Sequence, residues 1–138
     1  MDLIIDTSVI IAVIANEPEK SALVAQTQGA DLFAPLSVYW EIGNAFSAML
    51  KRGRITIEQA KAAVEIYKQI PLNLMEVDLV QAVELASQLN IYAYDAYIIA
   101  CAINHKCPLL SLDTGLVRAA KAIGIDVLEV TQTDANIP

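Results

Sequence analysis

Four acidic residues of this 138-residue chain lie among apolar neighbours, where a charged side chain is unusual. They are Asp6 at the end of LIID, Glu41 in SVYWEIGNA, Asp95 in IYAYDAYIIACA and Asp113 at the end of LLSLD. An isolated buried carboxylate costs on the order of several kcal/mol unless it is paired or bound to a metal ion. Of the nine basic residues, most are lysines expected on polar helix faces, so four dedicated salt bridges are not expected. A divalent cation is the more economical partner.

Taken singly, these acids also have a simpler explanation. Asp6, Glu41 and Asp113 stand where helix caps or first-turn acids are common. Asp95 lies inside an apolar helical segment and has no such explanation, and the four together favour a metal site. Oxygen ligands that leave coordination positions open suit Mg²⁺ or Mn²⁺.

Two polar residues near the acids are candidates for supporting them. Ser8 follows Asp6 by two positions and also suits the cap of a helix over residues 9–15. Asn44 lies one helical turn after Glu41. Each could support a carboxylate or serve only the fold, and the sequence leaves both roles open.

Short apolar runs alternate along the chain with longer segments of helical period, which is typical of an α/β fold with a parallel sheet covered by helices. Strands are predicted over residues 3–6, 32–34, 74–77, 109–112 and 127–130. In such sheets the carboxyl ends of the strands and the starts of the following helices share one edge. Asp6 and Asp113 end strands, whereas Glu41 and Asp95 begin helices. We therefore expect all four to converge in one crevice.

The predicted helices carry recognisable start and stop signals. A Thr56 to Gln59 capping box begins a helix that stops before Pro71, and Asp78 caps another. The remaining helices are predicted over 37–52, 93–104 and 114–123. The segment 93–104 is apolar on nearly every face and should lie in the middle of the domain.

Composition limits the class of protein. With 56% hydrophobic and 18% charged residues, the chain should form one domain over 1–138, with a tail from 131 that frays. The apolar stretch 3–15 contains Asp6 and is too short to cross a bilayer, so no membrane association is expected. The acidic start MDLIID lacks a basic secretory region, which predicts a cytoplasmic location. A net charge of -7 argues against non-specific adhesion to nucleic acid.

Several reaction types lack the residues that they need. The five glycines form neither GxGxxG nor a P-loop, which disfavours dinucleotide and nucleotide triphosphate sites. The single histidine, His105, excludes a pair of histidines acting as general acid and base within one chain. His105, Cys101 and Cys107 are too few for a structural zinc site. We expect a structural or surface role for His105 and apolar burial for the cysteines.

The segments LIIDTS, an E-x-x-N helix, YDAYIIACA and LLSLDTGL resemble a PIN domain, most closely the VapC-type toxins of prokaryotic toxin–antitoxin systems. The resemblance covers almost the whole chain. It implies a three-layer α/β/α fold with a central five-stranded parallel sheet and Mg²⁺-dependent cleavage of RNA. It also implies a homodimer and inhibition by a cognate antitoxin protein.

The resemblance assigns site residues by position. Asp6, Glu41, Asp95 and Asp113 match the acidic quartet of the family. Ser8 matches the small polar residue after the first Asp. The family usually has Thr two residues before the fourth acid, where this chain keeps the hydroxyl as Ser111.

The mechanism expected on this basis is metal-assisted phosphodiester hydrolysis, in which bound ions lower the pKa of water and neutralise charge on the phosphate. Asp6, Asp95 and Asp113 are the expected metal ligands, direct or through water. Glu41 is expected as a further ligand or as the group that orients the attacking water.

Positive charge for RNA could come from Lys51, Arg52, Arg54 or Arg118. Lys51 and Arg52 close a helix, where cations suit the dipole, so Arg54 and Arg118 are the better candidates.

Other functions fit less well or remain open. A response-regulator receiver needs an acidic pair after the first strand, but Thr7 and Ser8 follow Asp6. A haloacid-dehalogenase phosphatase needs DxD, and Ser8 holds the second acidic position. The open alternative is a catalytically silent PIN-fold module that binds RNA or protein.

Overall fold

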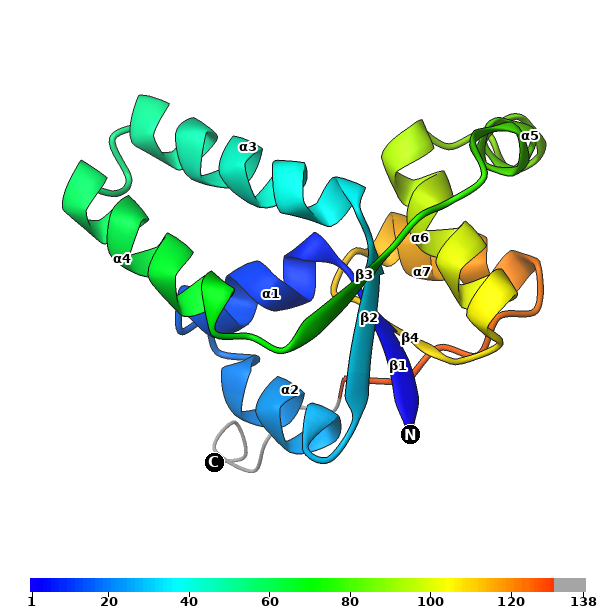
Figure 1. The fold of residues 1–138 in the computed structure, drawn as a ribbon, viewed down its shortest axis with the longest axis horizontal. Helices are drawn as coiled ribbons and strands as arrows, with labels where there is room; N and C mark the ends of the chain where they lie inside the picture. Colours follow the sequence, from blue (N-terminus) through cyan, green and yellow to red (C-terminus); the bar gives the residue numbers. More distant parts are fainter. Residues whose placement is uncertain (131–138) are drawn as a thin grey trace.

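The computed structural model describes residues 1–130 and shows a parallel sheet with helices on both faces (Figure 1). The strands are β1 (Asp2–Ile5), β2 (Asp31–Pro35), β3 (Leu72–Met75) and β4 (Leu109–Leu110). Their order is β3-β2-β1-β4 and every pair is parallel. The predicted α/β class is confirmed. The predicted tail, 131–138, lies outside the described residues.

The prediction of five strands is wrong, because the described chain forms a four-stranded sheet. In place of a strand over 127–130, Val127 forms one isolated parallel bridge with Leu109. The Leu109 N–H donates to the Asp126 carbonyl, and the Leu128 N–H donates back to the Leu109 carbonyl, both at 2.9 Å. The pairing stops there because β4 is only two residues long. Pro108 before it has no N–H to donate.

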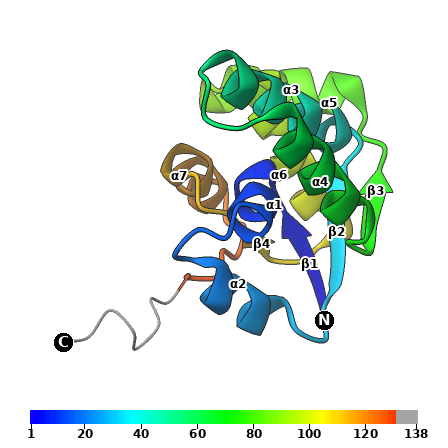
Figure 2. The same cartoon turned by 90° about the vertical axis from the view of Figure 1, so that its left-hand side faces the viewer.

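Helices cover the two faces of the sheet in two groups (Figures 1 and 2). One group is α1 (Thr7–Ile14), α2 (Lys20–Thr27), α3 (Ser37–Lys51) and α4 (Ile57–Lys68). The other is α5 (Leu79–Leu89), α6 (Ala93–His105) and α7 (Thr114–Ala122). Helix α2 was not predicted. It is short, buries only Ala22 and Leu23, and has no side-chain cap at Glu19, so its sequence carries little helical signal.

The capping signals read from the sequence are largely confirmed. Thr56 and Gln59 form the reciprocal capping box of α4, and the Asp78 carboxylate accepts from the Val80 N–H to cap α5. The prediction that Ser8 caps this helix is wrong. Helix α1 begins earlier, at Thr7, and its N-cap residue is Asp6.

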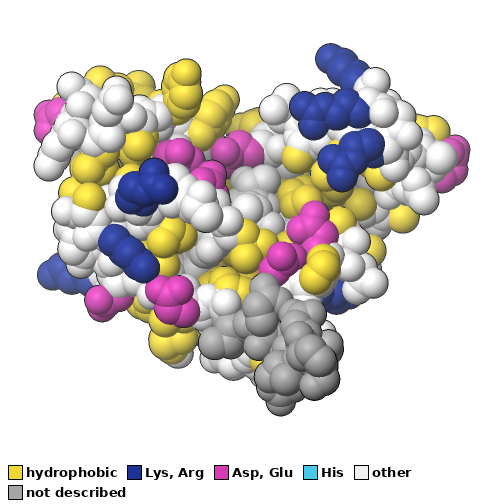
Figure 3. All heavy atoms as spheres, turned by 180° about the vertical axis from the view of Figure 1, so that it is seen from behind, with side chains coloured by type: hydrophobic (Ala, Val, Ile, Leu, Met, Phe, Trp, Pro, Cys, Tyr) yellow, Lys and Arg dark blue, Asp and Glu magenta, His cyan; other side chains and the backbone are white. Residues whose placement is uncertain are grey.

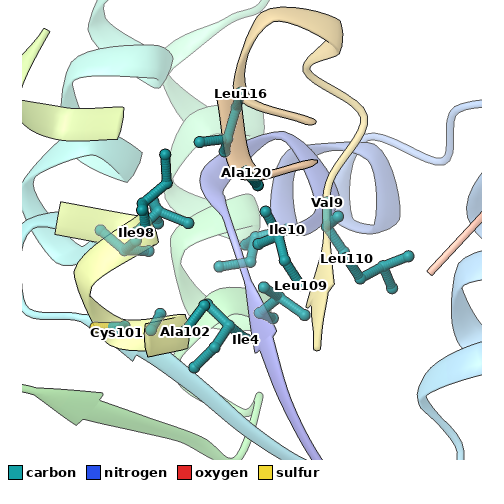
Figure 4. Packing of buried hydrophobic residues seen from close by; sticks show 14 of the residues in the cluster. Ile4, Val9, Ile10, Ile98, Cys101, Ala102, Leu109, Leu110, Leu116 and Ala120 are labelled. Atoms are coloured by element: carbon teal, nitrogen blue, oxygen red, sulfur yellow. The ribbon is translucent and has the colours of Figure 1, made fainter. Parts of the chain in front are cut away.

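The core fixes the edge of the sheet from which the site residues emerge. Figure 4 shows Ile4 of β1 and Leu109 of β4 packed with Ile10 of α1, Ile98 of α6 and Leu116 of α7. Six residues of α6 are buried, which confirms its predicted central position. A close-packed core of this kind restrains backbone movement, so the residues that follow β1 and β4 start from fixed positions. Within residues 1–130, none of the helices has the length and apolarity that a membrane span needs.

Candidate active site

Asp6 leaves the end of β1 and is the N-cap residue of α1. Its Oδ1 accepts hydrogen bonds from the Ser8 hydroxyl at 2.6 Å and from the Val9 N–H at 3.2 Å. Its Oδ2 accepts from the Ser111 hydroxyl at 2.6 Å. The residue is only 6% exposed, so these bonds hold a nearly buried carboxylate in one orientation.

Two serine hydroxyls join the ends of β1 and β4. Ser111 donates to Asp6 and accepts from the Asp113 N–H at 2.9 Å. Ser8 donates to Asp6 and accepts from the Leu112 N–H at 3.0 Å. The structure thus places both predicted supporting serines between the first and fourth acids.

Asp113 begins α7 in the same way that Asp6 begins α1. Its Oδ1 accepts from the N–H groups of Gly115 and Leu116, at 3.0 and 3.1 Å. Its Oδ2 accepts no hydrogen bond from residues 1–130, and the side chain is exposed. One oxygen therefore caps the helix while the other remains open to a ligand.

Glu41 and Asp95 reach the same edge from α3 and α6. Glu41 lies in the second turn of α3, and its Oε2 accepts from the Thr7 hydroxyl at 3.0 Å. Thr7 was not predicted as a site residue. Asp95 lies in the first turn of α6 and makes no hydrogen bond within the described chain. The dipole of α6 favours a negative charge at Asp95, whereas Glu41 lies beyond the first turn of α3, where this effect has fallen off.

Burial and mutual repulsion raise the pKa of three of these carboxyls. For Asp6, burial has the largest effect, hydrogen bonds from Ser111, Ser8 and the Val9 N–H oppose it, and the charge of Asp113 adds to the rise. The pKa of Glu41 is raised by burial and by the charges of Asp6 and Asp95, against the lowering effect of Thr7. The pKa of Asp95 is raised by burial and then by Asp113 and Asp6. The structure thus brings the four predicted acids together as one electrostatic group.

No Lys, Arg or His within residues 1–130 forms an ion pair with any of the four acids. Figure 3 shows acidic side chains gathered in the hollow between the two groups of helices, with Lys and Arg side chains on the flanks. The charge of the carboxylates is therefore not balanced by protein cations in this part of the chain.

The donor set consists of carboxylate oxygens, which suits Mg²⁺ or Mn²⁺. Within the described residues, however, no three His, Cys, Asp or Glu side chains are grouped closely enough to form a metal site. Asp6 and Asp113 each direct one oxygen to a helix cap and not to the other acids. Mg²⁺ retains several waters in proteins, so carboxylates at this spacing could bind it partly through water.

The remaining predicted residues lie further from the carboxylates. Asn44 is exposed on α3, and its side chain forms no hydrogen bond within residues 1–130. Arg54 follows α3, thirteen residues after Glu41, which corresponds to roughly 20 Å along a helix. Arg118 is exposed on α7, where it lines a hollow of about 490 Å³ that Ser111 also lines. None of the four acids lines this hollow, so Arg118 is connected to the site only through Ser111.

The single histidine lies at the opposite edge of the sheet. The His105 Nε2 is 2.8 Å from the Asp2 Oδ2, and its ring packs 4.2 Å from that of Phe33. These contacts support the structural role predicted for His105. Cys101 is buried, as expected, whereas Cys107 is only partly buried.

Comparison with known proteins adds a family and a fold. The sequence matches the PIN domain family over residues 3–122, and no curated protein matches it. PAE2754 from Pyrobaculum aerophilum superposes with a TM-score of 0.69 at 20% identity, covering 92% of each chain. VapBC2 from Rickettsia felis, solved bound to a DNA fragment from its promoter, gives 0.67 at 15% identity over 93% of this chain and 98% of that one.

A third structure is that of Mycobacterium tuberculosis VapC20, a toxin that cleaves the sarcin–ricin loop. It superposes with a TM-score of 0.61 at 14% identity, covering 95% of this chain and 99% of that chain. At such low identities these likenesses establish the fold.

Proposed function

The chain belongs to the PIN domain family, and on this premise we propose that it is a Mg²⁺-dependent endoribonuclease, the toxin of a type II toxin–antitoxin pair. The observation that carries the proposal is the group formed by Asp6, Glu41, Asp95 and Asp113. Burial and neighbouring carboxylates raise the pKa of Asp6, Glu41 and Asp95, and none of the four acids forms an ion pair with a protein cation within residues 1–130. Like charges held together in this way destabilise the fold, and a bound divalent cation would offset that cost.

The four acids would hold Mg²⁺ or Mn²⁺, which supplies a water of lowered pKa and positive charge beside the phosphate. Asp6 is held in one orientation by Ser8 and Ser111, which would position it as a ligand. Glu41 is oriented by Thr7 through one oxygen, and the other can accept a proton from the attacking water. Asp95 and the open Oδ2 of Asp113 complete the donor set.

The decisive experiment is RNA cleavage by the purified protein with Mg²⁺ and with EDTA. We expect cleavage only with the metal, leaving 5′-phosphate and 3′-hydroxyl ends because water, and not the ribose 2′-hydroxyl, is the nucleophile. Asp6→Asn should abolish it. Asp31→Asn is the matched control, because Asp31 is an exposed acid at the opposite end of β2.

Cleavage in EDTA, or 2′,3′-cyclic phosphate ends, would refute the metal-assisted mechanism. RNA binding without cleavage by the intact protein under any divalent metal would instead identify a silent PIN-fold binding module.

A cognate antitoxin is the proposed partner of a cytoplasmic homodimer. The acidic hollow would attract an Arg or Lys of the antitoxin, which would occupy the place of the metal ion. Inhibition should therefore weaken at high salt. An antitoxin that binds at the same affinity in high salt, or that leaves cleavage intact, would contradict this arrangement.

A further inference from the structure

A pocket of about 350 Å³ lies where β2 and β3 end, at the same edge of the sheet as the four acids. Its apolar wall comes mainly from Leu36, Met75, Leu79 and the ring of Tyr97, and its polar groups from Ser37 and Glu76. The volume is at the small end of the roughly 300–1,000 Å³ typical of ligand pockets. None of these residues takes part in the carboxylate site described above.

The pocket and the carboxylate site share the start of α3. Ser37 lies four residues before Glu41 and therefore on the same face of that helix. Helix α6 contributes to both sites from different sides, with Asp95 at the acids and Tyr97 at the pocket. Both helices begin at the edge of the sheet where the strands end (Figure 1). An RNA strand with a phosphodiester bond at the acids would therefore carry a nearby nucleotide to the pocket.

The walls suit an unpaired nucleobase. Proteins bind such bases by stacking them on aromatic rings and by hydrogen bonds to their Watson–Crick edges. Tyr97 offers a partly exposed ring, packed edge-on against Tyr94 at a centroid distance of 5.9 Å. Ser37 also lines the pocket, and its hydroxyl oxygen is buried without a hydrogen-bond partner among residues 1–130.

The carboxylate of Glu76 determines which base the pocket would prefer. An ionised carboxylate such as that of Glu76 only accepts hydrogen bonds. Guanine presents two adjacent donors, N1–H and the 2-amino group, which match the two carboxylate oxygens. Adenine, cytosine and uracil each place at least one acceptor beside their donor on this edge, which a carboxylate repels.

We propose that this pocket holds an unpaired guanine within one or two nucleotides of the scissile bond, with Glu76 accepting from its N1–H and 2-amino group. The inference rests on the proposed ribonuclease function and extends it to sequence preference. Glu76 is an exposed side chain between β3 and α5, so its replacement leaves the fold intact.

The test is cleavage of a random-sequence, single-stranded RNA pool, with sequencing of the cut ends. The intact protein should favour guanine at one fixed position relative to the cut, on the order of tenfold for a bidentate contact. Glu76→Gln replaces one acceptor oxygen by an NH₂ donor. The amide can pair with the N1 and 6-amino group of adenine, with the N3 and 4-amino group of cytosine, or with the N1–H and O6 of guanine, so the preference for guanine at that position should weaken.

Two further measurements sharpen the test. Inosine, which lacks the 2-amino group, should slow cleavage severalfold at that position in the intact protein but not in Glu76→Gln. Glu84→Gln makes the same chemical change on the exposed face of α5, outside the pocket, and should leave the preference unchanged.

An RNA-cleaving protein with no base preference, or with the same preference in Glu76→Gln, would overturn the inference and leave the proposed function standing. Loss of self-association in Glu76→Gln by sedimentation, with cleavage preference unchanged, would assign the pocket to an interface between copies and would also overturn it. If the intact protein cleaves no RNA, the proposed function fails. Binding of guanine-containing and inosine-containing oligonucleotides in EDTA then tests the pocket separately.

Discussion

At the residue scale, Asp95 differs from the other acids because its place in the first turn of α6 is not accompanied by any hydrogen bond from the described chain. Asp6 and Asp113 cap helices and Glu41 accepts from Thr7, whereas Asp95 makes no hydrogen bond within residues 1–130. Burial and the charges of Asp113 and Asp6 raise its pKa, so its ionised form destabilises the folded state. The structure therefore gives Asp95 no stabilising hydrogen bond, which makes it the sharpest test of the proposed metal site.

Asp95→Asn should therefore separate stability from activity. The variant removes one negative charge at nearly constant shape, so in EDTA it should unfold at the same or a higher temperature than the parent. Its nuclease activity should collapse, and the rise in Tm caused by Mg²⁺ should shrink because the ion binds the native state less tightly. Differential scanning calorimetry with EDTA and with Mg²⁺ measures both effects. An Asp95→Asn protein much less stable than the parent in EDTA would show that Asp95 is a structural acid.

In contrast to Asp95, Ser111 is fully hydrogen-bonded. Its hydroxyl donates to the Asp6 carboxylate and accepts from the Asp113 N–H. Ser111→Ala would remove a hydrogen bond from buried Asp6 and leave the Asp113 N–H without its partner. We expect a loss of about 1–3 kcal/mol in the free energy of unfolding, measured by urea denaturation, and a lower cleavage rate. Ser111→Thr keeps the hydroxyl and should restore most of both. If Ser111→Ala matches the parent, the hydrogen-bond bridge between β1 and β4 is unimportant.

The sequence predicted the four acids because each interrupts an apolar pattern, which is a local signal. It could not predict the role of Thr7, because the contact with Glu41 joins residues 34 positions apart. Thr7 is also not a charged residue within an apolar run, so it carries no local signal of its own. The sequence allowed both Asp6 and Ser8 as the cap of α1 and could not decide between them, since both residue types suit an N-cap.

At the scale of elements, two of the acids have a double task as helix caps and candidate ligands. Asp113 caps α7 with one oxygen and keeps the other open. Replacement by Ser preserves a good N-cap but removes the carboxylate, whereas Ala removes both. Asp113→Ser should keep the parent's stability to within a few tenths of a kcal/mol, and Asp113→Ala should lose about 1 kcal/mol. Both should be inactive.

Urea denaturation and RNA cleavage on the same preparations measure this separation. Equal stability of the Ser and Ala variants would mean that the cap contributes nothing to α7. Activity in Asp113→Ser would mean that a hydroxyl suffices and that Asp113 is not a ligand.

Element prediction succeeded where periodicity or capping was strong and failed where neither was present. The helix over 93–104 and the capping box at Thr56 were found because their signals are local. Helix α2 has a weak pattern, and the run over 127–130 has strand-like composition yet pairs through one bridge. Whether an apolar run joins a sheet depends on the length of its neighbour, and β4 offers two residues.

At the scale of the whole molecule, parallel strand order places the site and the pocket at one edge. Residues 6, 41, 95 and 113 meet there because β1 and β4 are neighbours and α3 and α6 begin beside them. That edge was predictable from the general geometry of α/β sheets. The pocket at Glu76 was not, because its walls come from three segments with no shared motif.

Carboxylates that are paired in the folded state usually make stability rise with pH. The four acids at this edge should have the opposite effect. Burial and repulsion raise the pKa of Asp6 and Asp95 above 3.8 and that of Glu41 above 4.5, the ordinary values. The folded state therefore binds protons more readily than the unfolded chain. Their contribution to stability is fully present below the ordinary values and is lost as pH rises through the raised ones.

In EDTA, the Tm should accordingly fall as pH is raised above 4.5, the highest of these ordinary values. In excess Mg²⁺ this fall should be removed or reversed, because the ion binds the deprotonated carboxylates of the native state and competes with protons for them. Calorimetry across this pH range with and without metal measures the two slopes. Asp31→Asn should retain both slopes, whereas Asp95→Asn should flatten them. Of these two residues, only Asp95 is one of the four acids whose charges repel one another. A Tm that rises with pH in EDTA would mean that the carboxylates are already paired with protein cations, and the argument for a metal ion would lose its physical basis.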